Sequence, residues 1–305
     1  MTDFSKMTII TENRGYMNTK SNNTKIKQFF HEVTSTFSYV VYSELSKMGV
    51  LIDPVLDYDH KSGRTSTKFA NQILDFCNSN SLKIDWILET HAHADHLSSA
   101  QFLKSHLGSD VCIGENIRLV QDTFSKIFNI SDITDKNYYF DQLLKDGDKL
   151  LAGDLEIEVI STPGHTPACC SFRIGDNLFI GDTLFMPDIG SARCDFPGGN
   201  AQTLYDSVQK IYSLGDHIRL FMCHDYPKDR DYQFMSTVKQ QKETNIHLKK
   251  HITKEIFVDM RTKRDSTLEM PNLILPAIQF NIRAGGNLPL DDNGVAYLKI
   301  PIDAI

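Results

Sequence analysis

Paired cysteines are missing from this sequence. The 305 residues include six cysteines, which are scattered along the chain and form no Cys-x-x-Cys pair. A small disulfide-stabilised secreted domain is therefore excluded, because such domains need closely spaced cysteines. In a chain of this length the six residues are typical of reduced thiols, and we expect a cytoplasmic protein.

Long apolar runs are missing as well. The N-terminus has no hydrophobic stretch of the secretory type, and no run approaches the length of a membrane span. We therefore expect neither secretion nor a membrane partner. Nucleotide-binding motifs are equally absent, since the chain has no P-loop and no Gly-x-Gly-x-x-Gly fingerprint.

An excess of positive charge is also lacking. The formal net charge is −7 and the isoelectric point is near 5.9, which argues against a nucleic-acid partner. Two local basic runs, Lys249–His251 and Arg261–Arg264, are interpreted as solvated helix faces rather than as binding surfaces.

What the chain does have is an ordinary globular composition, with 41% hydrophobic and 23% charged residues. Residues 1–27 are polar and rich in Asn, Thr, Ser and Lys, and we expect them to form a poorly ordered tail. Residues 28–305 are expected to form one domain, which includes a closing C-terminal extension over about residues 255–305.

The most informative stretch is Thr90–His96, which reads Thr-His-Ala-His-Ala-Asp-His. It contains three imidazoles and a carboxylate, on His91, His93, Asp95 and His96. An apolar run, Ile84–Leu88, precedes it as a buried strand, and helical spacing follows it up to Gly108. Nitrogen and oxygen donors around one strand-to-helix turn predict a metal site.

Three more metal-type residues follow predicted strands. His165 lies in the rigid turn Thr162–Pro167, Asp182 ends a strand after Leu178, and His224 follows the strand Ile218–Cys223. A single histidine at such a place is more often a packed residue than a ligand. Four strand ends that all carry ligand types favour one metal site in a layered α/β protein.

The remaining elements are expected to alternate in type. Ordered structure is expected to begin near Phe29. Helices are predicted from Thr65, over Glu115–Phe128, between Asn200 and Gly215, and through most of Gln233–Met260. The segments Leu273–Arg283 and Leu288–Ile305 are predicted to be extended.

The order of these motifs resembles the metallo-β-lactamase superfamily. The resemblance comprises His-x-His-x-Asp-His, His165 in Thr-Pro-Gly-His-Thr, Gly-Asp-Thr at residues 181–183 and Cys-His-Asp at residues 223–225, and it runs from Phe37 to Tyr226. It implies an α/β fold, the four-layer αββα sandwich, with the metal at one edge of the two sheets. The fold alone does not decide the reaction.

Further segments resemble the persulfide dioxygenases of that superfamily. They are Ser191–Phe196, Ala201–Val208 and His224–Tyr226. The stretch from Met260–Asp265 through Asn281–Gly285 is similar to a bacterial branch often labelled β-lactamase-like hydrolases. The resemblance implies oxidation of glutathione persulfide by O2 to sulfite and glutathione, at one mononuclear non-heme Fe(II) per chain, in a homodimer.

Roles follow from this resemblance by position. His91, His165 and Asp182 would hold the iron as a facial triad of two imidazoles and a carboxylate. Arg193 and Tyr226 would bind glutathione; the alternatives are an Arg193–Asp195 ion pair and a half-buried aromatic ring. The remaining metal-type residues would orient the iron ligands, and they are His93, Asp95, His96 and His224.

A di-zinc hydrolase is the alternative interpretation. His91, His93 and His165 would then hold one zinc and Asp95, His96 and His224 the other, with Asp182 as the bridge. Such a centre would hydrolyse acylglutathione thioesters, as glyoxalase-II-type enzymes do, or a lactone. The number of ligands suits both interpretations, whereas the C-terminal region does not match the helical glyoxalase II domain. Cys194 is given no role, because no general base lies beside it in the sequence.

Overall fold

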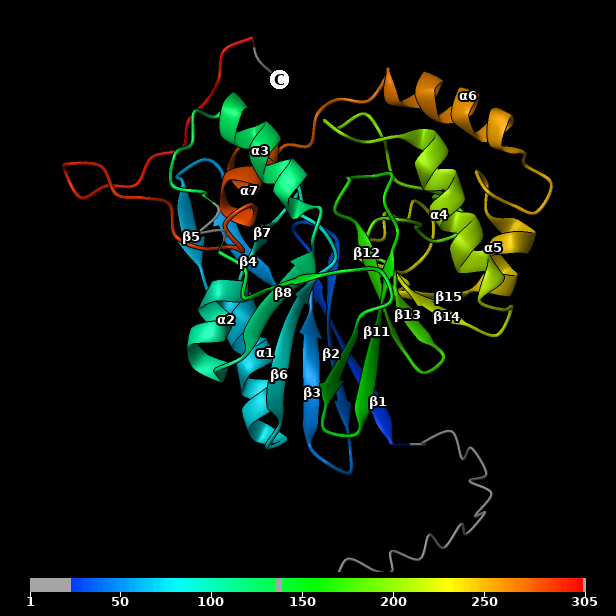
Figure 1. Cartoon of the computed structure of the whole chain (residues 1–305), viewed down its shortest axis with the longest axis horizontal. Coiled ribbons are helices and arrows are strands. Elements are labelled where there is room, and N and C mark those ends of the chain that lie inside the picture. Colours follow the sequence, from blue (N-terminus) through cyan, green and yellow to red (C-terminus); the bar gives the residue numbers. More distant parts are fainter. Residues whose placement is uncertain (1–22, 135–138, 304–305) are drawn as a thin grey trace, which may run out of the picture.

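Two β-sheets packed face to face form the centre of the molecule, and helices cover the outer face of each sheet (Figure 1). The computed structural model describes residues 23–134 and 139–303. Helices α1, α2, α3 and α7 lie on one side of the sandwich, and α4, α5 and α6 lie on the other. The αββα sandwich expected from the sequence is confirmed.

The two sheets of the sandwich each contain six strands. The first six-stranded sheet contains, in spatial order, β1 (Thr24–His31), β2 (Thr36–Ser43), β3 (Met48–Ile52), β6 (Lys83–Glu89), β8 (Asp110–Gly114) and β9 (Gln142–Leu144). The second contains β10 (Lys149–Ala152), β11 (Leu155–Ser161), β12 (Cys170–Ile174), β13 (Asn177–Phe179), β14 (Arg219–Phe221) and β15 (Met235–Thr237). A small third sheet contains β5 (Arg64–Ser66), β4 (Val55–Asp59) and β7 (Leu97–Ser98).

Seven helices are described in residues 23–134 and 139–303. On the side of the first sheet they are α1 (Lys68–Ser79), α2 (Ala100–Leu107), α3 (Ile117–Ile127) and α7 (Ile274–Asn281). On the side of the second sheet they are α4 (Ala201–Ser213), α5 (Val238–Thr244) and α6 (Lys254–Asp265).

The hydrophobic core fills the three spaces between the four layers. Side chains alternate along β2, so that Phe37, Tyr39 and Val41 pack between the sheets while Val40 packs toward α1. The third cluster lies between the second sheet and its helices, where Leu204 of α4 is fully buried. Both faces of the central strands are thus covered, which explains their nearly continuous apolar sequences.

Strand direction brings the metal-type residues to one edge of the sandwich. Strand β6 ends at Glu89, directly before the histidine-rich stretch. Strands β13 and β14 run parallel, so Asp182 and His224 both follow the same ends of neighbouring strands. His165 follows β11, which ends at Ser161. The expected placement of ligands after strands is therefore observed.

The first strand begins earlier than predicted. Residues Thr24–Lys27, which we expected in the tail, belong to β1 and pair with β2 in an unbroken antiparallel register. We did not predict a strand there because the residues are polar. Strand β1 is an edge strand, and lysines on an edge strand prevent it from pairing with other chains. The rest of the predicted tail, residues 1–22, lies outside the described residues.

The prediction for the C-terminal region was wrong in two places. Residues Leu273–Arg283 do not form an extended segment, because α7 occupies Ile274–Asn281. Six of its eight residues are buried, so the sequence shows no amphipathic period, and Pro276 lies in the first turn, where a missing N–H is tolerated. The segment Gln233–Met260, expected to be mainly helical, contains strand β15, helix α5 and only the first part of α6, with non-helical residues between the two helices.

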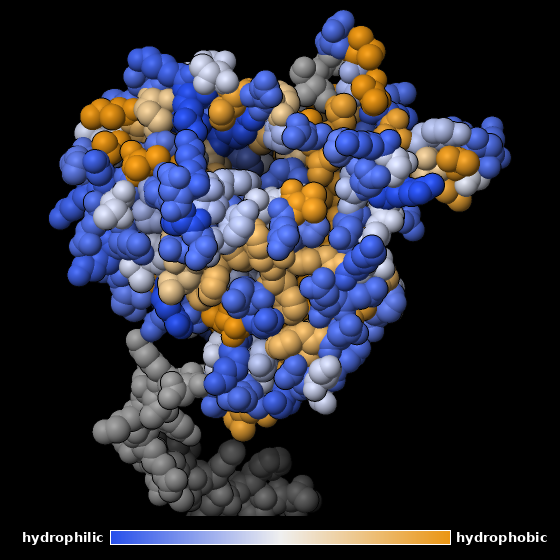
Figure 2. Space-filling view, turned by 180° about the vertical axis from the view of Figure 1, so that it is seen from behind, coloured by the Kyte–Doolittle hydropathy of each residue, from blue (hydrophilic) through white to orange (hydrophobic). Residues whose placement is uncertain are grey.

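Beyond α7 the chain leaves the body as an exposed segment. Figure 2 shows apolar side chains along this protruding segment, and the exposed apolar residues there are Leu290, Val295, Tyr297, Ile300 and Ile302. Across residues 23–134 and 139–303, every helix is too short or too polar to span a lipid bilayer.

Candidate metal centre

The histidine-rich loop is anchored to the end of β3 by one buried carboxylate. Asp53 accepts hydrogen bonds from the Thr90 backbone N–H to Oδ1 at 2.8 Å and from Thr90 Oγ1 to Oδ2 at 2.9 Å. Asp53 has a φ of 49°, an unusual left-handed conformation for a residue with a side chain. Asp53 therefore holds the loop after β6 through two groups of Thr90, the backbone N–H and the side-chain hydroxyl.

All seven metal-type residues predicted from the sequence come together at this edge. The ligand atoms of His91, His165 and Asp182 lie within 4.8 Å of one another, and all three residues are buried. A second group lies beside the first and comprises His93, Asp95, His96 and His224. Asp182 links the groups, because its Oδ1 lies 3.6 Å from His224 Nε2 and its Oδ2 lies 3.8 Å from His91 Nε2.

Hydrogen bonds on the outer ring nitrogens fix the tautomers of the first group. His165 Nδ1–H donates to the Arg193 carbonyl at 2.8 Å, which leaves the lone pair on Nε2. His91 Nδ1–H donates to Thr90 Oγ1 at 3.0 Å, because that hydroxyl already uses its proton on Asp53. Both rings thus present Nε2 to the cluster as an acceptor.

The histidines of the second group are oriented in the same way. His96 Nδ1–H donates to Asp95 Oδ1 at 3.3 Å, and His224 Nδ1–H donates to the Ser35 carbonyl at 3.3 Å. His93 is turned around, since its Nε2–H donates to Asp53 Oδ1 at 3.1 Å and Nδ1 faces inward. Each ring is therefore held by an outer partner, as metal-ligating histidines usually are.

Several of the inward atoms have no hydrogen-bond partner among the described residues. They are His91 Nε2, His93 Nδ1, His96 Nε2, His224 Nε2 and Asp182 Oδ1. A buried polar atom without a partner costs about 1–3 kcal/mol, so a protein rarely gathers five at one point without a use. Imidazole and carboxylate donors suit iron and zinc alike. The residues present fit a metal centre.

Burial and neighbouring charges shift the pKa values of the buried imidazoles in different directions. Burial, with the charges of neighbouring histidines, holds the pKa of His91 well below its usual value and lowers the pKa of His96 to about 3. Both rings are neutral at pH 7 and can act as ligands. Burial would also lower the pKa of His93, but the carboxylates of Asp53 and Glu89 outweigh it and raise this pKa well above the usual value.

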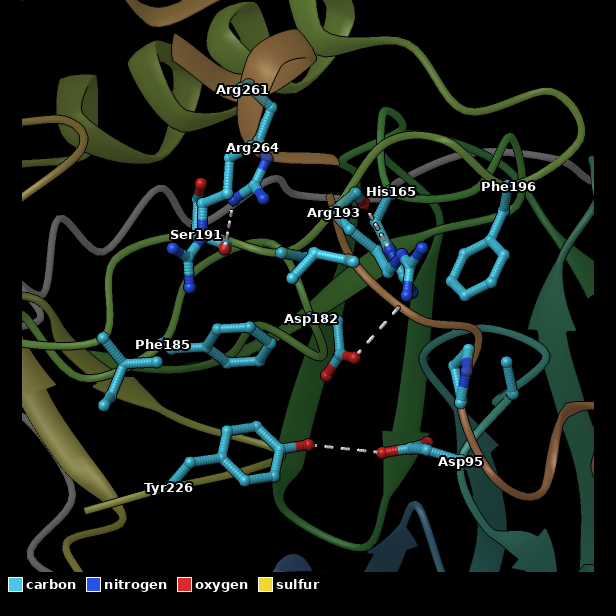
Figure 3. A pocket seen from close by; sticks show the side chains of 15 residues that line it. Asp95, His165, Asp182, Phe185, Ser191, Arg193, Phe196, Tyr226, Arg261 and Arg264 are labelled. Carbon is cyan, nitrogen blue, oxygen red and sulfur yellow. Dashed lines mark hydrogen bonds and ion pairs between the residues drawn. The ribbon is translucent and has the colours of Figure 1, made fainter. Parts of the chain in front are cut away.

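A cavity of about 270 Å³ opens from the metal-type residues toward α6 (Figure 3). Asp95, His165 and Asp182 lie at its base. Its walls are mainly apolar and include Phe185, Ile189, Ala192, Phe196 and Leu268, with polar groups on Ser191, Arg193, Tyr226, Arg261 and Arg264. An apolar cavity with a few converging polar groups is the usual form of a small-molecule site.

Both residues expected to bind the substrate line this cavity. Arg193 also forms the ion pair considered as its alternative, with two contacts of 2.6 Å to Asp195, and its Nη1 donates to the Glu269 carbonyl at 2.6 Å. Tyr226 is 42% exposed and donates to Asp95 Oδ2 at 3.4 Å. Burial of its phenol and the nearby Asp95 raise the pKa of Tyr226 well above its usual value, so it stays a donor.

The sequence profile of the metallo-beta-lactamase superfamily matches residues 32–224. The chain belongs to this superfamily. A probable metallo-hydrolase from Burkholderia pseudomallei is 47% identical over 292 residues, which cover 92% of this chain and 99% of the relative. Glyoxylase B2 from Dictyostelium discoideum is 46% identical over 288 residues, which cover 93% and 98%.

Persulfide dioxygenases are similar at a greater distance. Human mitochondrial persulfide dioxygenase ETHE1 is 30% identical over 268 residues, which cover 87% of this chain and 90% of the relative. The crystal structure of ETHE1 from Myxococcus xanthus shares 26% identity and a TM-score of 0.69, covering 86% of this chain and 100% of that chain. The resemblance to the superfamily and to its persulfide dioxygenases is confirmed, and members of this superfamily are generally metal-dependent enzymes.

Two buried carboxylates behind the superfamily's histidine motif were missed in the sequence. Asp53 and Glu89 both face His93 Nε2, at 3.1 Å and 3.3 Å. Glu89 also bonds the Ser98 hydroxyl. A glutamate four residues before His93 was an available signal, whereas the approach of Asp53 depends on the pairing of β3 with β6 and was not.

The C-terminal helix completes the loop that carries the histidine motif. Asn281 Nδ2 donates to the carbonyls of His93 at 2.8 Å and His96 at 2.7 Å, and its Oδ1 accepts from Ser98 N–H at 2.8 Å. The motif Asn281–Gly285, noted in the sequence only as a likeness, is thus a clamp on the metal loop. No local sequence signal links Asn281 to a loop more than 180 residues earlier.

Proposed function

We propose that the protein is a glutathione-dependent persulfide dioxygenase with one Fe(II) per chain. Glutathione persulfide, O2 and water would give glutathione and sulfite. The observation that carries the proposal is the compact group of His91, His165 and Asp182, two imidazoles and one carboxylate at the base of a cavity. Similarity to persulfide dioxygenases over 87% of the chain supports it.

These three residues would hold the metal through His91 Nε2, His165 Nε2 and one oxygen of Asp182. A ligand set of this kind leaves open positions on the ion. Ferrous iron, when bound, supplies the activation of dioxygen and the oxidation of sulfur. The chain itself contributes rings held in fixed tautomers and mainly apolar walls that limit the access of water.

The orientation of His93 suits a site with one metal or with two. Asp53 and Glu89 both face its Nε2–H, which leaves Nδ1 as the inward atom. With a single iron, His93, Asp95, His96 and His224 would shape the site around the ion and orient its ligands.

The substrate would lie along the cavity with its sulfur end toward the metal-type residues. Tyr226 would donate a hydrogen bond near the sulfur, because its raised pKa keeps the phenol protonated at neutral pH. Arg193 would position the tripeptide with the N–H groups that Asp195 and the Glu269 carbonyl leave free.

A di-zinc hydrolase of acylglutathione thioesters is the second candidate. The group of His93, Asp95, His96 and His224 supports it, because four more donor residues lie beside the first three. The 46% identity to a protein named Glyoxylase B2 points the same way. In that case Asp182 would bridge the two ions.

The deciding experiment is oxygen uptake by the iron-loaded protein on addition of glutathione persulfide, with sulfite measured in parallel. We expect one O2 consumed for each sulfite formed. Protein verified to contain iron that consumes no O2 would exclude the dioxygenase. The zinc-loaded protein would then be assayed with acylglutathione thioesters.

The proposal extends to assembly and location, for which we expect a cytoplasmic homodimer. The chain has a mass of 34.6 kDa. Light scattering behind a sizing column would give twice that mass for a dimer, and a mass equal to one chain would contradict the expectation.

A further inference from the structure

Three arginines line the cavity, and their charges are not equally available. Arg193 is balanced by Asp195 through two contacts of 2.6 Å. Arg261 is almost fully buried and pairs with Asp265, with Nε at 2.8 Å from Oδ1. Neither guanidinium therefore offers an uncompensated charge to a ligand.

Arg264 is different from its two neighbours. It lies three residues after Arg261 on α6, so both side chains occupy the same face of the helix. Arg264 lines the cavity, yet within residues 23–134 and 139–303 its guanidinium forms no hydrogen bond and no ion pair. In Figure 3, Arg264, Arg261 and Ser191 lie at one end of the cavity, and Asp95 lies at the other.

The wall that carries Arg264 is held in place from several sides. Arg261 Nη1 donates to the Ser191 carbonyl at 3.2 Å, and Asp265 Oδ2 accepts from the Cys194 N–H at 2.9 Å. On the far side, His247 Nδ1 accepts from the Ser191 N–H at 3.0 Å. Helix α6 is thus tied to the loop beside the metal-type residues, which fixes where the backbone of Arg264 lies relative to the cavity.

We propose that Arg264 binds a carboxylate of the thiol carrier and so selects an anionic substrate. The identity of the carrier rests on the proposed function, in which it is glutathione, a peptide with two carboxylates. A guanidinium presents a planar pair of N–H donors that matches a carboxylate. Arg264 is exposed, so its guanidinium is accessible to a ligand that enters the cavity. The interpretation of Arg261–Arg264 as a solvated helix face is wrong for Arg261, which is buried against Asp265. It holds for the exposed residues from Thr262 to Arg264, although Arg264 also lines the cavity.

The test measures binding rather than turnover. Calorimetry would compare S-methylglutathione with its diethyl ester, in which both carboxylates are blocked, on the iron-loaded full-length protein. We expect Arg264→Ala to weaken S-methylglutathione binding about tenfold and to leave ester binding unchanged. Arg264→Lys should lie between, because it keeps the charge and loses the planar pair of donors.

Lys263→Ala is the matched control. Lys263 is the neighbouring cation on α6, but it pairs with Asp259 at 2.8 Å and does not line the cavity. Its removal should leave both affinities unchanged.

The outcomes separate this inference from the proposed function. Unchanged S-methylglutathione affinity in Arg264→Ala would overturn the inference, even if the wild type consumes O2 with glutathione persulfide. Weakened binding in Arg264→Ala with no oxygen uptake would keep the inference and exclude the dioxygenase. A wild-type protein that binds no glutathione derivative would overturn both the carrier and the role of Arg264.

Discussion

Asp182 lies within 4 Å of imidazoles from three separate loops, those of His91, His165 and His224. Its Oδ1 has no hydrogen-bond partner in the described part of the chain, and burial raises its pKa. Such a residue costs stability unless a cation compensates its charge. Function and stability therefore make opposite demands at this one position.

Asp182→Asn tests this conflict. The variant should bind no stoichiometric iron, as measured by elemental analysis, and should show no oxygen uptake. In the metal-free state it should unfold with a free energy about 1 kcal/mol higher than the metal-free wild type, since a buried carboxylate is replaced by a neutral amide. Asp146→Asn, at a surface carboxylate paired with Lys210, serves as the control and should change neither quantity by much. Full iron content in Asp182→Asn would contradict its assignment as a ligand.

His247 predicts a pH dependence that does not involve the metal-type residues. Burial, together with the charges of Arg261 and Arg264, lowers its pKa to about 4. The unfolded chain, with a histidine pKa of about 6.5, binds more protons than the folded chain between these values. The contribution of His247 to stability is therefore fully present above about pH 6.5 and is lost as the pH falls toward 4.

Urea unfolding of the wild type and of His247→Gln at several pH values would measure this contribution. The stability advantage of the wild type should shrink below pH 6.5, with a slope of at most about 1.4 kcal/mol per pH unit. A constant difference between pH 4.5 and 7.5 would contradict the lowered pKa.

Residue types at strand ends were enough to predict the seven metal-type residues, because ligand chemistry allows few substitutes. The sequence offered two interpretations of Arg193, a glutathione-binding residue and a partner of Asp195. The structure places Arg193 in the cavity wall and in the ion pair. It did not reveal the carboxylates behind His93, since their approach depends on which strands pair. Nor did it separate Arg264 from Lys263, because only the direction of each side chain from the helix distinguishes them.

At the scale of elements, the turn after α7 packs tightly against the loop that carries the histidine motif. Gly285 has a φ of +70°, and a Cβ there would lie 2.2 Å from the Ser98 carbonyl oxygen. Gly63 has nearly the same φ, +69°, but no atom lies within 4 Å of its Cβ position. Alanine substitutions at the two positions therefore separate the cost of a left-handed backbone, present in both, from the cost of the contact with Ser98, present only at Gly285.

Gly63→Ala should lower the free energy of unfolding by about 1 kcal/mol, the usual penalty of a left-handed alanine. Gly285→Ala should cost about 3 kcal/mol or more, because the backbone of the metal loop must also move. Denaturant unfolding measures both, and equal losses in the two variants would show that contact with Ser98 has no effect.

Elements with strong local signals were predicted well. Helix α4 begins as expected at Asn200, whose side chain accepts from the Thr203 N–H, and α2 ends at Gly108 with a φ of 70°. Helix α7 was missed because it is buried on nearly all sides, and β1 because it is a polar edge strand. Helix α7 lacks the amphipathic period that one solvent-facing side produces. Strand β1 has an exposed side, but the lysines there, Lys25 and Lys27, made its start resemble a polar tail.

At the scale of the whole molecule, the four packed layers bury every cysteine side chain. All six cysteines are free and buried, and burial raises the pKa of each. Thiolates form only at high pH in such surroundings, so the thiols resist oxidation and alkylation. This agrees with the reduced cysteines expected from the sequence.

A thiol reagent measured by absorbance should therefore find no reactive cysteine within minutes in the native protein and all six in denaturant. Rapid reaction of even one thiol under native conditions would show that a layer opens on that timescale.

The clamp formed by Asn281 also bears on the order in which the protein is made. Ser98 and Asn281 are 183 residues apart. At about 5–20 residues per second, a ribosome needs roughly 10–40 s to synthesise the residues between them. Throughout that interval the nascent chain carries the histidine loop without its partner. The metal centre is therefore complete only when the C-terminal helix has been made. A chain that ends shortly before Asn281 would contain every proposed ligand but would lack the hydrogen bonds from Asn281 that hold the histidine loop.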